Sequence, residues 1–458
     1  MKIAIEGCCH GHLDAIYGQI ATLEAQNNYK VDLLLICGDF QAVRNWRDLE
    51  CMAVPQKYKA LGDFHKYYTG EAVAPIPTII IGGNHEASNY MWELYHGGWL
   101  APNMYFLGHA GTVQVNGIRI AGVSGIFSGH DFRQGHHEKL PYDRSTMRSI
   151  YHVREYDIRR LSLLSSPHIV LSHDWPQGIE HHGNLQGLLR RKRFFENDIR
   201  AGKLGSPPLM GLLQNLKPQW WFSAHLHTRY EATFNHTPDI PLQRTQPPPP
   251  PPPPAAPKPI ENPDEIVIED DEFDSAEPSA STSEAPQPEK EAPPTSNPDE
   301  ILLDDEEVEV EAPPTAPPQP IVTNFLSLDK CLPQRQFLEV IDIEAPLSNP
   351  TAALAFDPEW LAINRAFHPW FSTTRSQRPF PEEAEARAMI AKELEWVNAN
   401  VKRNDDGVIP VDDWQTFVQT APGPGSEGAL KFKQPDLYPN PQTAAFCKFI
   451  DIPDKISS

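Results

Sequence analysis

Five short apolar runs in the first half of the chain each end in residues that can bind a metal or carry a proton. The strings that follow them are Gly7-Cys8-Cys9-His10, Cys37-Gly38-Asp39, Gly83-Asn84-His85, Ser172-His173-Asp174 and His225-Leu226-His227. The carboxyl ends of strands in an α/β sheet meet at one edge, and ligands bind there. Five such endings therefore favour one shared site over five unrelated turns.

The residue types in these strings suit a transition metal. Cys8 and His10 are two positions apart in extended chain, so their side chains point the same way while that of Cys9 points toward the core. Thiolate, imidazole, carboxylate and amide ligands together favour zinc, iron or manganese over calcium or magnesium. The set is larger than one ion normally takes, and the Asp39 carboxylate could bridge two. The candidate ligands are Cys8, His10, Asp39, Asn84, His173, His225 and His227.

The elements that would position these residues alternate between strand and helix over residues 1–238, which predicts an α/β sheet with helices on its faces. Asn116-Gly117 predicts a tight hairpin turn between two further strands, Thr112–Val115 and Ile118–Ser124. The apolar spacing predicts helices over Leu13–Ala25 and Gln56–Tyr68. The predicted strands that lead into the candidate ligands are Lys2–Glu6, Leu33–Ile36, Thr78–Ile81, Ile169–Leu171 and Trp220–Phe222.

The segment Ser124–Arg160 differs from the rest because it has few aliphatic residues and many basic, aromatic and histidine residues. One interpretation is a solvated surface insertion that ends in a helix. The other is a substrate loop, because basic and aromatic groups together suit phosphate contact and base stacking. Arg190–Arg193 is a second basic cluster, and a charge run of this kind is most often a solvated helix face. The candidate substrate contacts are Arg133, Tyr142, Arg144, Arg148 and Tyr151.

The acidity of the chain is concentrated in one segment. The whole chain of 458 residues has a formal net charge of −22 and 48 prolines. Residues 247–320 contain 20 acidic and 2 basic residues, so about −4 remains for everything else. The acidic balance therefore says little about what the folded part binds. Residues 239–320 are predicted to be a disordered acidic, proline-rich linker.

This linker contains a short repeat, in which Asn-Pro-Asp-Glu-Ile is followed by two more aliphatic residues and then by acids. An aliphatic run of this kind could add as a strand to the edge of a partner's sheet. Residues 264–273 and 299–307 resemble motifs that bind small ubiquitin-like modifiers. The alternative is an acidic spacer with incidental aliphatic residues.

Beyond the linker, residues 321–458 again have a globular composition. A helix is predicted over Pro381–Arg403, with Ile390, Leu394, Val397 and Val401 on one face. The segment is too small and too rich in proline breaks to suggest a second enzyme. We therefore expect a smaller C-terminal domain that packs on the first.

The six irregularly spaced cysteines do not suggest a disulfide framework, so a reducing compartment is expected. No apolar run approaches the roughly 20 residues that span a bilayer. The chain starts directly with a strand and shows no signal-peptide pattern. These features predict a soluble intracellular protein with no membrane contact, and they leave the oligomeric state open.

Several longer strings resemble a known group of enzymes. The chain is similar to the calcineurin-like metallophosphoesterase superfamily, which commonly starts with Asp-x-His where this chain has Cys8-Cys9-His10. That departure matches one branch, the RNA lariat debranching enzymes. The resemblance covers about residues 1–236 and 321–345, and it is weak beyond about residue 370. The strings that carry it are Gly7–Gly11, Gly38–Asn45, Gly82–Asn89, Ser124–Phe127, Ser172–Pro176 and Phe325–Pro333.

This resemblance implies an α/β/β/α sandwich and two divalent metal ions, Fe2+, Zn2+ or Mn2+. One ion would be held by Cys8, His10, Asp39 and His227, and the other by Asp39, Asn84, His173 and His225. Two such ions would activate water for attack on the phosphate of a 2′-5′ bond. His85 matches the catalytic histidine and would be the general acid for the leaving 2′-oxygen.

The resemblance also assigns domains and a cellular role. Residues 1–238 would be the catalytic domain, with a lariat-recognition loop at 124–154, and residues 321–458 a C-terminal debranching-enzyme domain. The implied function is hydrolysis of the branch-point bond of excised intron lariat RNA in the nucleus, as a step in mRNA processing. The alternatives are a phosphomonoesterase or protein phosphatase of the same superfamily and a non-catalytic scaffold. Against the scaffold, no ligand and no catalytic histidine is missing.

Overall fold

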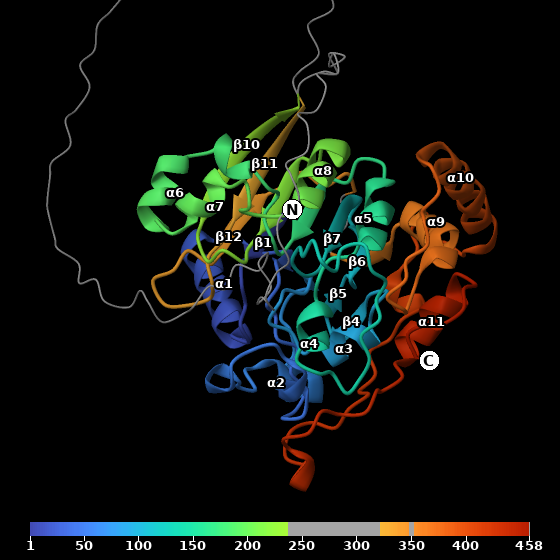
Figure 1. Ribbon diagram of the computed structural model, residues 1–458, viewed down its shortest axis with the longest axis horizontal. Helices are drawn as coiled ribbons and strands as arrows, with labels where there is room; N and C mark the ends of the chain where they lie inside the picture. Colours follow the sequence, from blue (N-terminus) through green and yellow to red (C-terminus); the bar gives the residue numbers. More distant parts are fainter. Residues whose placement is uncertain (237–320, 348–351, 458) are drawn as a thin grey trace, which may run out of the picture. The chain divides into compact units, whose positions relative to one another are not determined.

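Two mixed β-sheets form the centre of the computed structural model, which describes residues 1–236, 321–347 and 352–457 (Figure 1). The first sheet has the strand order β12-β1-β2-β3-β5-β4, and the second has the order β10-β11-β9-β8-β7-β6-β13. The inner strands β1, β2, β3 and β5 run parallel in the first sheet, as do β7, β8, β9 and β11 in the second. Parallel neighbours bring their carboxyl ends to the same edge of each sheet.

The strands are short, and most are buried. Their bounds are β1 Lys2–Glu6, β2 Leu33–Ile36, β3 Thr78–Ile80, β4 Gly98–Ala101, β5 Met104–Phe106, β6 Ala110–Val115, β7 Ile118–Val123, β8 Ile169–Ser172, β9 Trp220–Ser223, β10 Tyr230–His236, β11 Ile321–Ser327, β12 Leu338–Asp342 and β13 Leu354–Phe356. All five strands predicted to lead into the candidate ligands are confirmed. The predicted hairpin is also confirmed, because Val115 pairs with Ile118 across Asn116-Gly117.

The helices cover the sheets or extend from them. Their bounds are α1 Leu13–Asn27, α2 Phe64–Thr69, α3 Ser88–Glu93, α4 Thr146–Ser149, α5 Glu155–Ser162, α6 Leu185–Arg191, α7 Phe195–Arg200, α8 Pro207–Leu216, α9 Pro358–Phe367, α10 Glu383–Asn400 and α11 Pro441–Phe449. Ala4, Leu34, Ile36 and Ile80 pack against α1 in one apolar cluster. Since side chains alternate along a strand, the intervening buried residues face the second sheet. The predicted α/β architecture is confirmed.

One predicted helix is wrong. Residues 56–68 were expected to form a single helix, but the structure has a 3₁₀ turn at Gln56–Tyr58 and then α2 from Phe64. Gly62 lies between them with φ of 63° and approaches the backbone of Gly11 closely. A left-handed residue at that point interrupts helical hydrogen bonding. The prediction failed because apolar spacing does not register this break.

The residues after the linker complete both sheets. Strand β11 lies between β10 and β9, and β12 pairs antiparallel with β1. Strand β13 pairs with β6 at the far edge of the second sheet. The domain boundary predicted before residue 321 separates the two domains in the sequence. In the fold, however, the three strands that follow this boundary belong to the two central sheets. The predicted disordered linker and its repeat lie outside the described residues.

Two further expectations concern the whole chain. All six cysteines are free and buried, as expected for a chain without a disulfide framework. Within residues 1–236, 321–347 and 352–457, no helix combines the length and apolar character needed to cross a membrane.

Candidate metal centre

The carboxyl ends of β1, β2, β3, β8 and β9 bring the seven candidate ligands together. In one half of this cluster, ligand atoms of Cys8, His10, Asp39 and His227 all lie within 4.8 Å of one another. The Nε2 atoms of His10 and His227 are 3.2 Å apart, and His10 Nε2 is 3.8 Å from Asp39 Oδ2. Cys9, by contrast, packs in the apolar cluster under α1. This is the division between Cys8 and Cys9 that strand alternation predicts.

The other half of the cluster shares Asp39. His173 Nε2 lies 3.3 Å from Asp39 Oδ1 and 3.2 Å from Asn84 Oδ1. The rings of His173 and His225 have centroids 5.0 Å apart. Asp39 thus presents one carboxylate oxygen toward each half, which is the arrangement that a bridging carboxylate requires.

Strained backbone accompanies the candidate ligands. His10, Asp39, His225 and His227 all have positive φ, between 45° and 61°. Such conformations are uncommon for residues other than glycine, and each costs roughly 1–3 kcal/mol. Strain that recurs at four ligands of one cluster indicates that the chain holds them for a functional purpose.

Burial and mutual charge set the protonation of the cluster. Burial, together with the charges of Asp39 and Glu6, raises the pKa of the Cys8 thiol well above its ordinary value. Burial also lowers the pKa of His227 and, with the charge of His173, lowers that of His225 to about 3. Burial opposes ionisation of Asp39, but His173 and His85 hold its pKa well below the ordinary value. Burial therefore keeps His225 and His227 neutral, whereas at His173 burial is outweighed by Asp39, which raises the pKa of that imidazole.

These features fit divalent metal ions. His173 Nδ1 lies 2.8 Å from the carbonyl oxygen of Cys37, and a neutral ring that donates there, as a metal ligand must, presents the lone pair of Nε2 to two oxygen acceptors. Lone pairs that face one another in a buried site repel unless a proton or a cation lies between them. The thiol, imidazole, carboxylate and amide donors match soft to intermediate divalent ions.

His85 lies at the rim of this cluster. Its backbone N–H donates to Asp39 Oδ1 over 2.8 Å, and its ring Nδ1 is 3.3 Å from Asp39 Oδ2. Its side chain is 26% exposed, whereas those of Asp39 and His173 are essentially inaccessible. A histidine that contacts the shared carboxylate and also reaches solvent is placed to exchange a proton with a bound substrate.

Sequence reasoning gave no role to Glu86, which joins two of the ligand loops. Its buried carboxylate accepts hydrogen bonds from the backbone N–H groups of Phe40 and Gln41, both at 2.8 Å, and of Gly83 at 2.9 Å. Burial raises the pKa of this carboxyl to about 7, and the three N–H donors oppose that shift. The acidic residue in the Asn84-His85-Glu86 string was the available signal.

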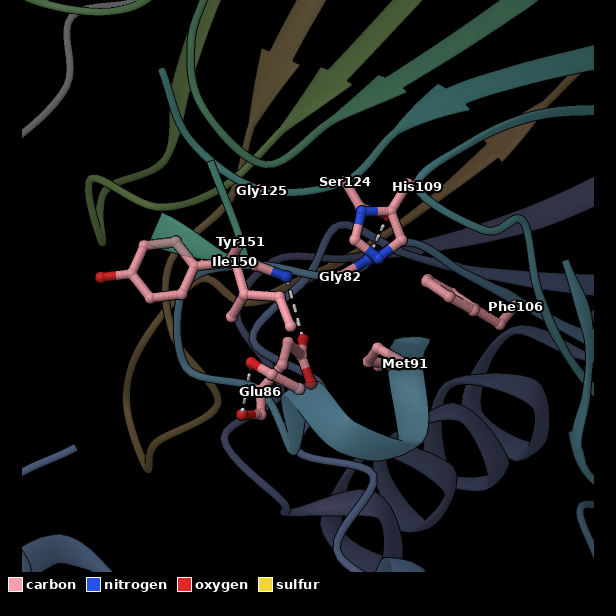
Figure 2. Close-up of a pocket in the computed structure, with 11 residues that line it drawn as sticks. Gly82, Glu86, Met91, Phe106, His109, Ser124, Gly125, Ile150 and Tyr151 are labelled. Carbon is pink, nitrogen blue, oxygen red and sulfur yellow. Dashed lines mark hydrogen bonds between the residues drawn. The ribbon is translucent and has the colours of Figure 1, made fainter. Parts of the chain in front are cut away.

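A small cavity of about 20 Å³ lies behind the same loops, and Figure 2 shows Glu86, His109, Ser124 and Tyr151 around it. The backbone N–H of Gly82 donates to Ser124 Oγ over 2.9 Å, and this hydroxyl donates to the carbonyl oxygen of Gly108. The volume suffices for about one water molecule. The segment Ser124–Arg160, which is predicted to contact the substrate and is named the recognition segment for that reason, therefore begins in direct contact with the loop that carries Asn84 and His85.

Two glycines allow the ligand loops to approach closely. A Cβ at Gly83 would lie 2.2 Å from Asp39 Oδ1, and a Cβ at Gly38 would lie 2.4 Å from His173 Nδ1. Gly38 also has φ of 107°. Any side chain at either position would displace a candidate ligand.

Two further acidic residues near the ligand loops have supporting positions. Asp14 lies in the first turn of α1 and accepts hydrogen bonds from Lys66 and Tyr67. Asp174 is buried and accepts from the backbone N–H groups of Trp175 and, at 3.5 Å, of Phe127. Asp174 thereby connects the His173 loop to the start of the recognition segment.

The five candidate substrate residues divide into two groups. Arg133, Arg144 and Arg148 are exposed. Tyr142 and Tyr151 are buried in an apolar cluster with Cys51, Ile126 and Ile150. The rings of the two tyrosines therefore serve packing in this structure, and their predicted stacking on RNA bases stays a prediction.

Other polar residues of the segment stabilise its own fold. Arg154 and Arg160 are buried and form ion pairs of 2.6 Å with Glu138 and Asp157. Among the basic residues of Ser124–Arg160, these two therefore form internal contacts. Arg133, Arg144 and Arg148 are exposed and can contact a partner.

Comparisons with known proteins agree with this architecture. A profile of the family described as calcineurin-like phosphoesterase matches residues 1–229. That match covers half of the chain and defines its class as a calcineurin-like metallophosphoesterase. A second profile, described as the C-terminal domain of lariat debranching enzyme, matches residues 320–455.

Three curated relatives, all named lariat debranching enzyme, support a narrower assignment. The Drosophila pseudoobscura pseudoobscura protein is 43% identical over 100% of this chain and 78% of its own length. The Schizosaccharomyces pombe protein is 43% identical over 97% of this chain and 95% of its own length. The Arabidopsis thaliana protein is 39% identical over 100% of this chain and 88% of its own length. The chain belongs to the lariat debranching enzyme family.

Proposed function

We propose that the chain is a metal-dependent phosphodiesterase that hydrolyses the 2′-5′ bond at the branch point of lariat RNA, which yields linear RNA for turnover. The observation that carries the proposal is the gathering of seven ligand-type residues and His85 at the carboxyl ends of strands from both sheets, with Cys8 among them. Family membership supports the same reaction, because the relatives are named for debranching of lariats.

The chain's residues suit two divalent ions that share Asp39. Cys8, His10, Asp39 and His227 would hold one ion, and Asp39, Asn84, His173 and His225 the other. A bound pair of such ions supplies a water-derived nucleophile and stabilises the charge that develops on the phosphate. Glu86 keeps the Asp39 and Asn84 loops in register through its three backbone contacts.

His85 would act on the leaving group. Asp39 contacts Nδ1 of its ring, so a proton carried at Nε2 is the one that the ring can deliver to the departing 2′-oxygen. The backbone N–H of His85 also donates to Asp39, which fixes the position of the ring relative to the bridging carboxylate.

The metals are proposed to be iron, zinc or manganese, with Cys8 as the discriminating ligand. A thiolate favours softer ions than the carboxylate common in this superfamily. A thiolate near iron is oxidisable, so activity should depend on reductant. Metal analysis of protein purified without oxygen, beside the Cys8→Asp variant, tests this. We expect altered metal preference with partial activity, and unchanged metal content would exclude Cys8 as a ligand.

Arg133, Arg144 and Arg148 are the proposed contacts for the phosphates of the RNA, because they are exposed on the recognition segment. Charge contacts of this kind weaken as salt concentration rises. Each arginine-to-alanine variant should therefore reduce RNA affinity and its salt dependence.

One assay separates the proposed reaction from the alternatives. The substrates are a branched RNA with one 2′-5′ bond, a linear 3′-5′ RNA of the same sequence and p-nitrophenyl phosphate. We expect cleavage of the branched bond and no cleavage of the linear RNA. Hydrolysis of the monoester alone would indicate a phosphomonoesterase, and no hydrolysis of any substrate would indicate a scaffold.

Two cellular proposals follow from the reaction and from the linker sequence. Processing of intron lariats implies a nuclear location, which imaging of a fluorescent fusion tests. Residues 264–273 and 299–307 are proposed to bind a small ubiquitin-like modifier, and they lie outside the described residues. Titration of a peptide covering residues 264–273 with such a modifier should shift its NMR signals, and unchanged signals would exclude the interaction.

A further inference from the structure

A basic cluster at the end of α6 takes no part in the proposed chemistry. It consists of Arg190, Arg191, Lys192 and Arg193, and its three arginines are exposed. The segment that carries it leaves the His173 loop and returns to it, because the backbone N–H of Ser206 donates to the carbonyl oxygen of Trp175 over 2.8 Å. The segment with α6 and α7 is therefore anchored at the edge of the second sheet where the ligands lie (Figure 1).

Contacts bring this cluster to the loop that carries His227. The guanidinium of Arg191 donates to the carbonyl oxygen of Arg229 over 3.0 Å, and Arg229 lies two positions after His227. The backbone N–H of Lys192 donates to the carbonyl oxygen of Leu188 over 2.8 Å, so Lys192 still belongs to the last turn of α6. The end of α6 therefore lies against the His227 loop.

The loop after β11 adds two cations to this cluster. Arg335 is exposed, and its Nη1 lies 3.6 Å from Asp329 Oδ2. Burial raises the pKa of the Asp329 carboxyl, and the charges of Arg335, Lys192 and Lys330 oppose that shift. One carboxylate thus lies among three cations, which leaves a net positive charge. The two segments together form a second basic surface, which consists of Arg190, Arg191, Lys192, Arg193, Lys330 and Arg335.

Lys330 lies directly beside the metal centre. Its backbone forms an isolated parallel bridge with that of Cys8, and the backbone N–H of Cys8 donates to the carbonyl oxygen of Asp329 over 3.3 Å. Burial lowers the pKa of His227, and the charges of His10 and Lys330 add to that shift. The second basic surface therefore reaches two of the candidate ligands, Cys8 and His227.

The second basic surface and the recognition segment flank the metal ligands. The parallel strands of the second sheet lie in the order β11, β9, β8 and β7. Strand β11 leads into Lys330, β9 and β8 lead into the histidine ligands, and β7 leads into the recognition segment. Neighbouring strands are about 4.8 Å apart, so roughly 14 Å separates β11 from β7. The ligands thus lie between two groups of cations.

Branched RNA has a shape that suits two such groups. The branch nucleotide carries phosphates on its 2′, 3′ and 5′ oxygens, so three strands leave the site when the 2′ phosphate lies at the metals. Lysine and arginine side chains that contact phosphates position a strand without reading its sequence. The ring of Phe194, which follows Arg193, is 42% exposed and offers a base a surface for stacking.

We propose that the second basic surface binds the phosphates of one arm of the branched RNA, while the exposed arginines of the recognition segment contact another arm. The inference rests on the proposed function, because it takes branched RNA as the ligand. Arms held on opposite sides of the metal centre would orient the branch nucleotide over the ligands. The surface would contribute affinity without sequence preference.

The test removes charge from the second basic surface. The triple variant combines Arg190→Gln, Lys192→Gln and Arg193→Gln, and it keeps the contact of Arg191 with Arg229. Lys330→Gln is a second variant on a different loop. The matched control also removes three exposed cations, in or just after α10, which packs on α9 at the opposite edge of the second sheet. It combines Arg387→Gln, Lys392→Gln and Lys402→Gln.

Affinity for labelled branched RNA is measured by fluorescence anisotropy at several salt concentrations. All proteins are metal-loaded and carry His85→Ala, which slows cleavage, and the protein with this change alone is the parent. Each phosphate contact contributes about 0.7 to the slope of log affinity against log salt for a single strand. The triple variant should therefore bind more weakly and lose about 2 from this slope, and Lys330→Gln about 0.7. The control should match the parent.

Branched RNAs with one arm shortened to a single nucleotide identify the arm. In the parent, shortening the bound arm should weaken binding by about the same factor as the triple substitution does. The two changes together should weaken binding no further than either alone. Shortening any other arm should weaken binding by the same factor in the parent and in the triple variant.

Two results would overturn the proposal. One is that the triple variant and Lys330→Gln bind every RNA with the affinity and the salt slope of the control. The other is that the triple substitution weakens binding of all the shortened RNAs by one factor, because no single arm would then occupy the surface. Failure of the unmodified protein to cleave the 2′-5′ bond is a different result. It rejects the proposed reaction, while the binding measurement still decides whether an RNA arm occupies this surface.

Discussion

The metal centre differs in construction from the junction between the recognition segment and residues 352–457, which form the C-terminal segment. At the metal centre each ligand follows directly from a strand end, and backbone geometry sets its direction. At the junction the contacts join residues about 290 positions apart, such as Tyr142 and Gln434. Local sequence therefore encodes the chemistry, whereas tertiary packing encodes the surface that would select the substrate.

The two regions also treat charge differently. The metal centre holds one carboxylate among imidazoles and suits external cations. Near the junction the buried charges are neutralised by the protein itself, through Arg154–Glu138 and Arg160–Asp157 pairs. Loss of a residue at the first region should abolish chemistry without unfolding the chain. Loss at the second should alter stability and substrate affinity.

The largest expected effect concerns His85. His85→Ala should lower kcat for branched RNA by about 10²–10⁴-fold, because a positioned general acid contributes that much. Metal content should not change, since His85 is not among the candidate ligands. Steady-state kinetics and metal analysis of the same preparation test this. His12→Ala is the control, because His12 is exposed beside the site and should keep full activity. A loss of bound metal in His85→Ala would show that His85 helps to hold the metal and is not only the general acid.

The second effect concerns the attachment of the C-terminal segment. Arg44 is buried, and its guanidinium donates to Asp48 and Glu93 at 2.8 Å and to Thr420 at 2.9 Å. Arg44→Met leaves two buried carboxyl groups without their cation, so the free energy of unfolding should fall by about 3–5 kcal/mol. Urea denaturation measures this.

The matched control is Arg200→Met, whose ion pair with Glu196 is exposed. Breaking a surface pair of this kind should cost about 0–1 kcal/mol. Equal losses in the two variants would mean that residues near 420 contribute nothing through Arg44. The C-terminal segment would then be held only loosely, in contrast to the metal centre.

The sequence predicted the metal centre better than the junction for a physical reason. Apolar runs mark strands, and the residues after them are restricted to a few positions at the sheet edge, so Cys8 could be separated from Cys9. Nothing local in Gln434 or Ser372 indicates that their partners lie in residues 135–142. Likewise β11 to β13 join the central sheets, although their sequence suggested only a smaller C-terminal domain that packs on the first. The periodicity of a strand's sequence does not indicate which distant strand it will pair with.

The third effect tests the junction directly. Gln434→Ala removes both hydrogen bonds to Tyr142, so the recognition segment should become less well positioned. KM for branched RNA should rise about three- to tenfold with little change in kcat, and stability should fall by about 1–3 kcal/mol. Gln419→Ala is the control, because Gln419 donates to the carbonyl oxygen of Tyr68, away from the recognition segment. A fall in kcat at unchanged KM would place Gln434 in the chemistry instead.

The smallest effect concerns pH and the histidines beside the junction. Burial, reinforced by the charge of His136, lowers the pKa of His109 to about 3. Arg154 and Arg160 act in the same direction and Asp157 opposes them. In the unfolded chain this histidine titrates near 6.5, so between about pH 6.5 and 3 the unfolded state binds more protons. The contribution of neutral His109 to the free energy of unfolding is therefore fully present above pH 6.5. It is lost progressively as the pH falls toward 3.

Between pH 7.5 and 5.5, His109 alone should account for a loss of about 1.4 kcal/mol in the free energy of unfolding. His109→Phe keeps a ring of similar size without the ionisable group, so its stability should fall less steeply over this interval by that amount. Urea unfolding with a chelator present measures the difference without a contribution from metal release. Parallel pH dependences of the two proteins would show that His109 is protonated in the folded state. In that case the junction would hold an uncompensated charge, and the contrast with the cation-binding metal centre would fail.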